Sequence, residues 1–515
     1  MKTLDDNEES AKARYEIERA VIDCAEMSLF IGDVQIATLA RGNFEFSVEW
    51  GKLIFAWWDE GVSQSWRVTA YEIDRGELRL RVARGMSRET ALLTLRDPAK
   101  MRERESQSPG ERRREYAETL SRLITKSFDG VKIERVTIGS SRSRSGVGRY
   151  ARLVLKSGGE TVLVIGASGA ESQAEVDGVV AAGLVSFAAF NEKRDEKDRA
   201  KRLWFCLPKG RSQTVMERAP LLDVSHLSAR IECFEVDEGG EEMTNIRPVT
   251  QDELLNSHPR EVIWPSASMP DERWRERIVN LAPDLIETRR DARSGRERFE
   301  IKGLEFARLS AGGRAKFGVA GARSEGEANL LTESNFSELE SLVRKIVRYR
   351  SADCLDRRHP FYLLRAEAWL ESLLRRDIRR LDPTFDERFV YSQIPAWRAD
   401  ERSVIDLLTI NYEGRLAVIE IKAAEDPQLP LQGIDYWLRV EQGRLRNEFK
   451  KRGLFEGVAI ADGSPLLYLV APRLRFHRTF EAVARCVSPR IEAYRIGVNT
   501  NWREGVKVHT RERIN

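Results

Sequence analysis

The chain has 515 residues, of which 41% are hydrophobic and 32% are charged, so it is long enough to form several domains with separate cores. Its 85 basic and 82 acidic side chains leave a formal net charge of only +3. A protein that binds nucleic acid as a bulk polycation is therefore excluded, and any nucleic-acid surface must be a local patch.

The beginning of the chain, MKTLDDNEES, is polar and acidic and resembles neither a signal peptide nor a transit peptide. We find no run of 18 apolar residues, so we expect no membrane span. The five cysteines are scattered without CxxC spacing, which argues against a zinc site or a disulfide framework. A cytoplasmic protein is the resulting expectation.

Residues 1–100 are predicted to form a small antiparallel β domain, because short alternating runs such as FEFSVEW and KLIFAWW are separated by turn residues. Trp50, Trp57, Trp58 and Trp66 lie in these runs. Their rings suit either the core of the domain or a platform on which bases stack. We favour the core, because large aromatic side chains supply most of the apolar area in a small β domain.

A charged linker leads into residues 110–265, which we predict to be an α/β domain. Its pattern is a helix, a strand and then a hairpin with the sequence ARLVLKSGGETVLVIGAS. A stretch with two prolines, residues 264–270, indicates a domain boundary.

Residues 270–352 are predicted to be an α/β connector that contains a second acidic constellation, Asp284 with Glu300 and Lys302. Apolar residues alternate with Glu300 and Lys302, so we expect both to lie on the solvent side of a strand. Asp284 lies in a segment with helical character, RIVNLAPDLIE. This constellation is therefore a weaker candidate for a site than the one in the last third of the chain.

Two helices are predicted next, Glu338–Tyr349 and Pro360–Leu381. In the second helix, apolar residues recur at helical spacing together with Glu367, so we expect Glu367 to face inward and Glu371 to border the same face. The apolar members of this stripe are Leu363, Leu370, Leu374 and Ile378.

The next feature is a predicted β-hairpin, in which the apolar runs Val404–Leu408 and Leu416–Ile421 flank a turn signal at residues 411–414. Both runs are apolar on both faces, as is typical of strands buried within a sheet. The hairpin belongs to the last predicted domain, residues 355–515.

Three charged residues interrupt this apolar hairpin: Asp406 in the first strand, and Glu420 and Lys422 at the end of the second. Buried carboxylates are costly unless they are paired or bind a metal. Glu420 and Lys422 are two residues apart and share a face, and Asp406 on the partner strand can lie opposite them. Two carboxylates can bind Mg²⁺ through hard oxygen ligands, and an ammonium can stabilise charge on a phosphate.

These residues resemble the motif of the PD-(D/E)XK nuclease superfamily: Asp406, thirteen intervening residues, then Glu420-Ile421-Lys422. Ile405 replaces the proline of the motif. The following QGIDY, residues 432–436, resembles the QxxxY helix of RecB-like and NucS-like members. The resemblance implies a restriction-endonuclease-like αβββαβ core for residues 355–515, within a mixed α+β multidomain protein.

The resemblance also implies roles for the residues of the motif. Asp406 and Glu420 would bind Mg²⁺ or Mn²⁺, and Lys422 would activate water or stabilise the leaving charge. An acidic residue on the first helix would assist, for which Glu367 is the first choice and Glu371 the second. The supporting residues would be Gln432 and Tyr436.

A basic helix is predicted over Leu431–Arg452, and it includes Arg439 and Arg444. It is either a solvated face or a surface that contacts the phosphates of a substrate. We expect a nucleic-acid partner, with DNA favoured over RNA, and leave open a homodimer or a complex with other proteins.

A shift of 255 positions aligns Leu163–Gly166 with Val418–Ile421. Either the 110–265 domain is a degenerate copy of the nuclease-like domain, or two α/β hairpin units are similar by chance. In this copy, apolar residues occupy the positions that correspond to Asp406, Glu420, Lys422 and Tyr436. The residues at the four shifted positions are, in order, Ala151, Ile165, Ala167 and Ala181.

The sequence therefore predicts a metal-dependent nuclease that hydrolyses phosphodiester bonds in DNA or RNA. The alternative is a non-catalytic nucleic-acid-binding or assembly protein that uses a nuclease-like fold as a scaffold. We favour the enzyme, because a scaffold has no need of buried charges.

Overall fold

The computed structural model describes most of the chain. The described residues are 2–4, 7–21, 24, 26–31, 34–40, 42–49, 51–59, 62–74, 77–83, 90–97, 109–139, 147–257, 272–290, 296–310, 313–319, 329–398 and 401–515.

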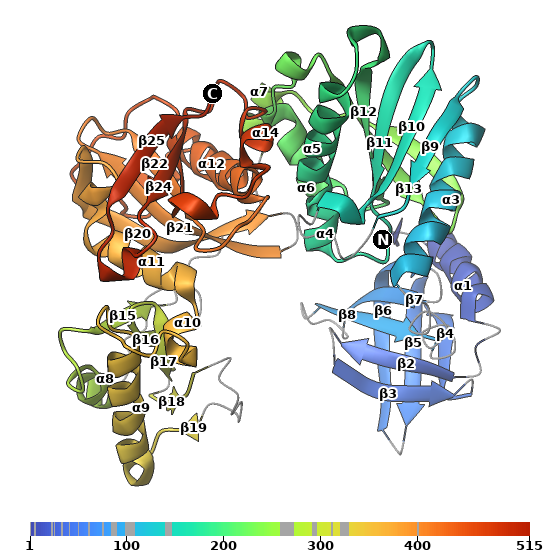
Figure 1. Cartoon of the computed structure of the whole chain (residues 1–515). Helices are drawn as coiled ribbons and strands as arrows, with labels where there is room; N and C mark the ends of the chain where they lie inside the picture. Colours follow the sequence, from blue (N-terminus) through green and yellow to red (C-terminus); the bar gives the residue numbers. More distant parts are fainter. Residues whose placement is uncertain are drawn as a thin grey trace. The chain divides into compact units, whose positions relative to one another are not determined.

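These residues form a mixed α+β protein, as the sequence predicts, and their strands belong to four β-sheets (Figure 1). The sheets lie within residues 2–96, 132–246, 286–330 and 385–513. The chain divides into two compact units, one formed by residues 1–123 with 237–242 and the other by residues 124–236 with 243–515.

The first unit contains a sheet of eight antiparallel strands in the order β3-β2-β8-β7-β6-β5-β4, with β1 paired to β6. An antiparallel sheet was expected within residues 1–100, and the strands of this sheet lie within that range, although the compact unit extends to residue 123. Its elements are β1 (Lys2–Thr3), α1 (Asn7–Val21), β2 (Glu26–Ile31), β3 (Val34–Ala40), β4 (Phe44–Glu49), β5 (Lys52–Asp59), β6 (Val62–Asp74), β7 (Glu77–Ala83) and β8 (Thr90–Arg96).

The tryptophans of this sheet divide between core and surface. Trp57 is only 5% exposed, and Trp66 is half-buried against the same core, whereas 39% of Trp58 is exposed. Trp50 lies outside the described residues. The expected role in the core is therefore confirmed for Trp57 and wrong for Trp58.

Helix α3 (Pro109–Ser127) belongs to the first unit up to Leu123, and its last residues lead into the six-stranded sheet of the second unit, whose order is β14-β13-β12-β11-β10-β9. Helix α5 lies along β11 and β12 (Figure 1). The elements are β9 (Lys132–Thr137), β10 (Ala151–Ser157), β11 (Glu160–Gly166), α4 (Gln173–Asp177), α5 (Val179–Glu192), β12 (Ala200–Pro208), α6 (Gln213–Arg218), β13 (Arg230–Asp237), β14 (Glu242–Ile246) and α7 (Gln251–Asn256).

The third sheet has five antiparallel strands and packs against α9, which ends at Tyr349 as predicted. The elements are α8 (Glu272–Val279), β15 (Ile286–Arg290), β16 (Glu297–Ile301), β17 (Leu304–Leu309), β18 (Ala315–Phe317), β19 (Asn329–Leu330), α9 (Phe336–Tyr349) and α10 (Pro360–Leu363).

The fourth sheet has six strands in the order β20-β21-β22-β23-β24-β25, and the predicted hairpin forms its β21 and β22. Gly414 in the hairpin turn has a φ of 81°, a conformation that favours glycine. The elements are α11 (Ala366–Arg376), β20 (Phe385–Arg398), β21 (Glu401–Asn411), β22 (Leu416–Ile421), α12 (Leu429–Leu445), α13 (Glu448–Lys451), β23 (Leu466–Pro472), α14 (Phe480–Ala484), β24 (Ala493–Val498) and β25 (Val508–Arg513).

The second and fourth sheets have the same topology. Each runs through six strands in chain order, with two antiparallel pairs followed by two parallel pairs. We call the segment with the second sheet, residues 132–256, the first half, and the segment with the fourth sheet, residues 366–513, the second half. In each half a long helix follows the third strand and packs on the third and fourth strands; this helix is α5 in the first half and α12 in the second half. This shared order is the one that the 255-residue shift predicts.

One detail of the predicted alignment is wrong. In the first half Arg152 pairs with Ile165, whereas continuing the Leu407–Ile419 register by one residue places Asp406 opposite Glu420. The hairpin turn of the second half is one residue longer, so Arg152 and not Ala151 stands at the position of Asp406.

The two halves share one apolar core. It contains side chains from the second sheet and its helices, such as Ile165 and Phe187, and from the fourth, such as Trp437 and Leu469. The sequence predicts that residues 110–265 and 355–515 are separate domains. In the structure, apolar side chains of both segments are buried together in one continuous core.

The segment Gln173–Glu192, which comprises α4 and α5, is the one described helix that is long and apolar enough to span a membrane. About 61% of its most apolar window is buried inside the protein, where α5 contributes to the shared core. Such burial is typical of a helix that packs in a protein core.

The predicted helix Pro360–Leu381 is interrupted, because Arg365 adopts a left-handed conformation with a φ of 50°. The buried Arg350 guanidinium donates hydrogen bonds to the carbonyl oxygens of Phe361 and Leu364, at 2.9 and 2.7 Å, and these bonds fix the break. The change of direction removes Leu363 from the predicted inward stripe, and its side chain is 55% exposed.

Candidate functional site

The two predicted carboxylates meet where β21 and β22 separate. The Oδ2 atom of Asp406 accepts a hydrogen bond of 2.9 Å from the backbone N–H of Ile421, so the side chain caps the end of the ladder. Glu420 lies one residue before Ile421 and is only 2% exposed. The hairpin therefore brings together the residues that the motif selects.

Burial and mutual repulsion dominate the electrostatics of this pair. Burial raises the pKa of Asp406 to about 6, although the Ile421 amide and the charge of Lys422 lower it. Burial, and then the charge of Asp406, raise the pKa of Glu420 well above its ordinary value. Two buried carboxyl groups cannot both be ionised without a nearby positive charge. Their proximity therefore favours the binding of a cation.

Lys422 completes the constellation. Its Nζ atom lies 2.9 Å from Oε1 of Glu420 and 4.0 Å from Asp426. Burial acts to lower the pKa of this ammonium, but attraction to Glu420, Glu367 and Asp406 outweighs burial and raises it. Lys422 is therefore a fixed positive charge beside the carboxylates.

Three buried acceptor oxygens, one on β22 and two at the beginning of α12, have no hydrogen-bond partner. Oε2 of Glu420 is one, and the Oε1 atoms of Gln428 and Gln432 at the beginning of α12 are two others. Buried polar atoms without partners are rare in folded proteins, and a hard cation is a ligand that oxygen acceptors can satisfy. Tyr436, one turn further along α12, is half-buried against the shared core.

The donor set therefore fits a divalent cation such as Mg²⁺ or Mn²⁺, with Asp406 and Glu420 as its charged ligands. Among the described residues, no three His, Cys, Asp or Glu side chains gather closely enough to hold a metal ion. The remaining ligands would have to be amide or backbone oxygens and water, which Mg²⁺ accepts.

The two candidate helix acids lie in different environments. Glu367, on the first turn of α11, is exposed, so the expectation that it faces inward is wrong. Its charge still reaches the site, since it acts on the pKa values of Asp406 and Lys422. Glu371, one turn later, is 2% exposed.

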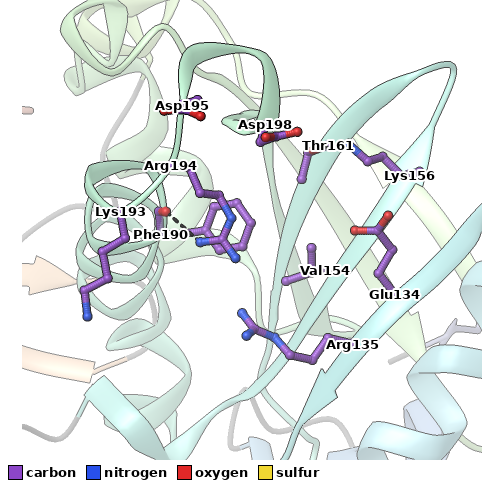
Figure 2. Close-up of a pocket in the computed structure, with 10 residues that line it drawn as sticks. All are labelled: Glu134, Arg135, Val154, Lys156, Thr161, Phe190, Lys193, Arg194, Asp195 and Asp198. Carbon is purple, nitrogen blue, oxygen red and sulfur yellow. Dashed lines mark hydrogen bonds between the residues drawn. The ribbon is translucent and has the colours of Figure 1, made fainter.

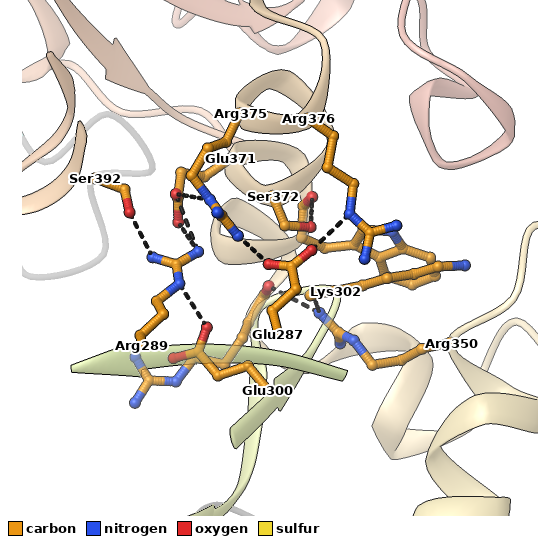
Figure 3. A network of polar contacts seen from close by, with 12 residues as sticks. Glu287, Arg289, Glu300, Lys302, Arg350, Glu371, Ser372, Arg375, Arg376 and Ser392 are labelled. Carbon is orange, nitrogen blue, oxygen red and sulfur yellow. Dashed lines mark hydrogen bonds and ion pairs between the residues drawn. The ribbon is translucent and has the colours of Figure 1, made fainter. Parts of the chain in front are cut away.

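Glu371 is held by an arginine that the sequence did not single out (Figure 3). Nη2 of Arg289 on β15 lies 3.1 and 3.0 Å from the two carboxylate oxygens of Glu371, and Nη1 lies 3.1 Å from Oγ of Ser392 on β20. Burial raises the pKa of Glu371 to about 7, and Asp406 adds to this, while Arg289 and Arg375 lower it. Arg289 therefore neutralises a carboxyl group near the site.

The same arginine explains why the second acidic constellation does not form a site. Glu300 is 6% exposed, and its carboxylate lies 3.0 Å from Nε of Arg289, so the expected solvent-facing position is wrong. Lys302 is half-buried in a turn with its Nζ atom 5.4 Å from the ring centre of Trp369. Asp284 lies exposed in the turn before β15, not in a helix.

The two arginines predicted to contact substrate are paired within the chain. Arg444 makes a two-pronged ion pair with Glu441, at 2.7 and 2.8 Å. Arg439 pairs with Glu217 of α6 in the first half and donates to Gln442 at 3.1 Å. A phosphate would have to displace these carboxylates, so the pairing weakens the case for direct contact.

A hollow of about 530 Å³ lies elsewhere, over β9–β11 and the end of α5 (Figure 2). Arg194 covers the ring of Phe190 there, with its guanidinium 3.5 Å from the ring centre. The charged side chains that line it are of both signs, namely Arg135, Lys156, Lys193 and Arg194 with Glu134, Asp195 and Asp198. This mixture gives no clear preference for a ligand.

Comparisons of this chain with family models, with curated proteins and with solved structures found no match.

Substitution of Arg289 tests its role beside Glu371. In Arg289→Met the buried Glu371 loses its main partner, so its pKa should rise above the present value of about 7. A carboxyl group with a raised folded-state pKa stabilises the protein below its ordinary pKa and loses that contribution as the pH rises. We expect a destabilisation of about 3–5 kcal/mol at pH 8 and less at pH 5, measured by denaturant unfolding.

The double variant Arg289→Met/Glu371→Gln is the matched control, since it removes the Glu371 carboxyl group, while Glu300, the other carboxylate that Arg289 pairs with, is affected equally in both variants. It should show a smaller change between pH 5 and pH 8 than the single variant. A single variant with the same pH dependence as the wild type would show that Arg289 does not govern the ionisation of Glu371.

Proposed function

We propose that the chain is a divalent-metal-dependent nuclease that hydrolyses phosphodiester bonds, with DNA favoured over RNA. The observation that carries the proposal is the comparison of the two halves. The same sheet forms with Ile165 and Ala167 where the second half has Glu420 and Lys422, so the fold does not require those charges. Burying the charges of Glu420 and Lys422 costs free energy, and the fold forms without them. A catalytic or metal-binding role is the best explanation for their presence.

Other features support this reading. The element order α11-β20-β21-β22-α12-β23 is the αβββαβ order that the resemblance implies. The carboxyl-terminal end of a strand beside a parallel crossover, where Glu420 and Lys422 lie, is also a common position for sites in α/β sheets.

The chemistry follows from the residues present. A bound divalent ion would lower the pKa of a coordinated water and offset charge on the phosphate. Asp406 and Glu420 would hold that ion, and Gln432 would support the site, as the resemblance implies. Lys422, kept protonated by its carboxylate neighbours, would stabilise the negative charge that develops on the phosphate.

Lys422→Ala separates catalysis from metal binding. It should reduce cleavage about 10²–10³-fold, the usual effect of removing one transition-state stabiliser. Binding of Mn²⁺, followed by calorimetric titration, should stay near that of the wild type, because the two carboxylates remain. Loss of Mn²⁺ binding would instead assign Lys422 to holding the carboxylates in place.

The rival function is a non-catalytic protein that binds nucleic acid or assembles a complex. The described residues offer two close carboxylates and not three, which is the observation that favours it. Incubation of the full chain with labelled single- and double-stranded DNA and RNA, in Mg²⁺, Mn²⁺ or EDTA, distinguishes the two. Binding without cleavage in any metal would favour the rival.

A further inference from the structure

The two halves meet around a local twofold axis. The backbone N–H of Asp223 donates to the carbonyl of Cys486 at 2.7 Å, and the N–H of Ser488 donates to the carbonyl of Leu221 at 2.9 Å. Between them Leu222 and Val487 form an isolated antiparallel bridge. If the two halves are exchanged, each of these two hydrogen bonds takes the place of the other. The same reciprocity is found in the self-complementary interface of a symmetric dimer.

The helices repeat this reciprocity. Helix α5 of the first half packs against α14 of the second, and α12 of the second packs against α6 of the first. Since α5 corresponds to α12 and α6 to α14, the two contacts are equivalent under the same exchange. One chain thus has the architecture of a dimer.

The two site positions lie on the same side of this pseudo-dimer. Nε2 of Gln428, at the beginning of α12, donates at 3.4 Å to the carbonyl of Gly178, at the beginning of α5. Arg218 bridges the same ends, because it donates to the carbonyl of Asp177 at 2.7 Å and pairs with Asp435 at 2.8 Å. The amino-terminal ends of both helices, which follow the site strands, are therefore close together.

The position of Asp406 is filled in the first half by a cation. Arg152 pairs with Ile165 in the hairpin register, and its side chain is half-buried. Its Nε atom is buried without a hydrogen-bond partner. No ion pair to Arg152 occurs within the described part of the chain. A guanidinium at this place suits a phosphate without a metal, because it supplies fixed donors to phosphate oxygens.

Resting on the proposed function, we infer that the substrate is double-stranded nucleic acid, of which the first half holds one strand through Arg152 while the second half cuts the other. A duplex backbone has local twofold symmetry, which matches the symmetry of the two halves. The product is a single-strand break.

The reaction in this scheme is a hydrolysis at one phosphorus. The oxygen of water forms a bond to phosphorus, and one phosphorus–ester oxygen bond breaks. A proton from the water ends on the departing oxygen, which leaves one hydroxyl end and one phosphomonoester end. The other strand is bound and stays intact.

The first test uses the full chain at low concentration with supercoiled plasmid in Mg²⁺ or Mn²⁺, sampled from the earliest times. Nicked circles should accumulate first, with linear molecules only after many nicks. Linear product as the first species would overturn the inference and leave the nuclease assignment standing. The absence of cleavage of any nucleic acid would overturn the proposed function, and the inference with it.

The second test measures binding in EDTA, without cleavage, by the fluorescence anisotropy of labelled duplex and single-stranded DNA. Arg152→Gln should weaken duplex binding about 10-fold and reduce the salt dependence by about one phosphate contact. Its effect on single-stranded DNA should be smaller. The matched control is Arg135→Gln, which removes the same charge from the neighbouring strand β9 (Figure 2).

Duplex binding that Arg152→Gln leaves unchanged, or that both variants weaken equally, would contradict the assignment of Arg152. Thermal unfolding of both variants separates this outcome from a folding defect. A misfolded Arg152→Gln is replaced by Arg152→Lys, which keeps the charge and should keep part of the affinity.

Discussion

Glu420→Gln and Asp406→Asn should each abolish divalent-ion-dependent cleavage, because each replaces one of two charged ligands by a neutral amide at a site whose affinity depends on ligand charge. The variants should remain folded. In Asp406→Asn the side-chain carbonyl oxygen can still accept the hydrogen bond that Asp406 takes from the Ile421 amide. Glu420→Gln removes a carboxyl group whose charge burial opposes, which lowers the cost of burying that position.

Cleavage is measured with and without EDTA, and Mn²⁺ binding is followed by calorimetry. Glu367→Gln is a useful companion, since Glu367 is exposed and acts on the site only through its charge; it should reduce the rate less than either ligand variant. Wild-type cleavage by both ligand variants would show that Asp406 and Glu420 are not the metal ligands.

The hairpin and its three charged residues could be predicted because the patterns that define them lie within a short segment of the sequence. Apolar runs on both sides of a glycine turn define β21 and β22, and alternation along those strands places Glu420 and Lys422 together. The common topology of the two halves could also be anticipated, since the apolar runs of the two hairpins have similar spacing although the residues at the site positions differ.

Other features depend on residues far away in the sequence. Glu300 was expected in solvent by alternation alone, but Arg289 on the adjacent strand covers it and joins it to Glu371, 82 residues beyond Arg289. No local pattern marks Arg289 as part of the site. Likewise, Arg350 interrupts the predicted helix, because it donates hydrogen bonds to carbonyl oxygens that a continuous helix would use itself.

The equivalence of Arg152 and Asp406 also required the structure. A fixed shift of 255 positions cannot show that one hairpin turn is a residue longer than the other. Because strand faces alternate with every residue, an error of one position exchanges an inward residue for an outward one. The register of the strands resolves it.

The shared core changes the expectation for fragments. Residues 355–515 alone would expose the apolar face of α12 that packs on the first half, and would leave Asp435 without Arg218. We therefore expect this fragment to be much less stable than the full chain, and tests of activity should use the full chain.

Asp435→Ala should be among the most destabilising single substitutions in the protein. Arg218 is fully buried and donates to both carboxylate oxygens of Asp435, at 3.0 and 2.8 Å, across the boundary between the halves. Without Asp435 the Arg218 guanidinium keeps, among the described residues, the carbonyl of Asp177 as a hydrogen-bond acceptor. Removing one partner of a buried ion pair costs about 3–5 kcal/mol, and denaturant unfolding of the full chain measures it.

The matched control is the double variant Arg218→Met/Asp435→Leu, which replaces the pair by apolar side chains inside the shared core. It should recover most of the lost stability, because neither a charge nor an unpaired acceptor of the pair stays buried. Recovery would show that Asp435→Ala loses stability because the buried Arg218 guanidinium is left without its carboxylate partner. An Asp435→Ala variant that loses less than about 1 kcal/mol would mean that water or another group reaches Arg218, and that the halves are not held together by this pair.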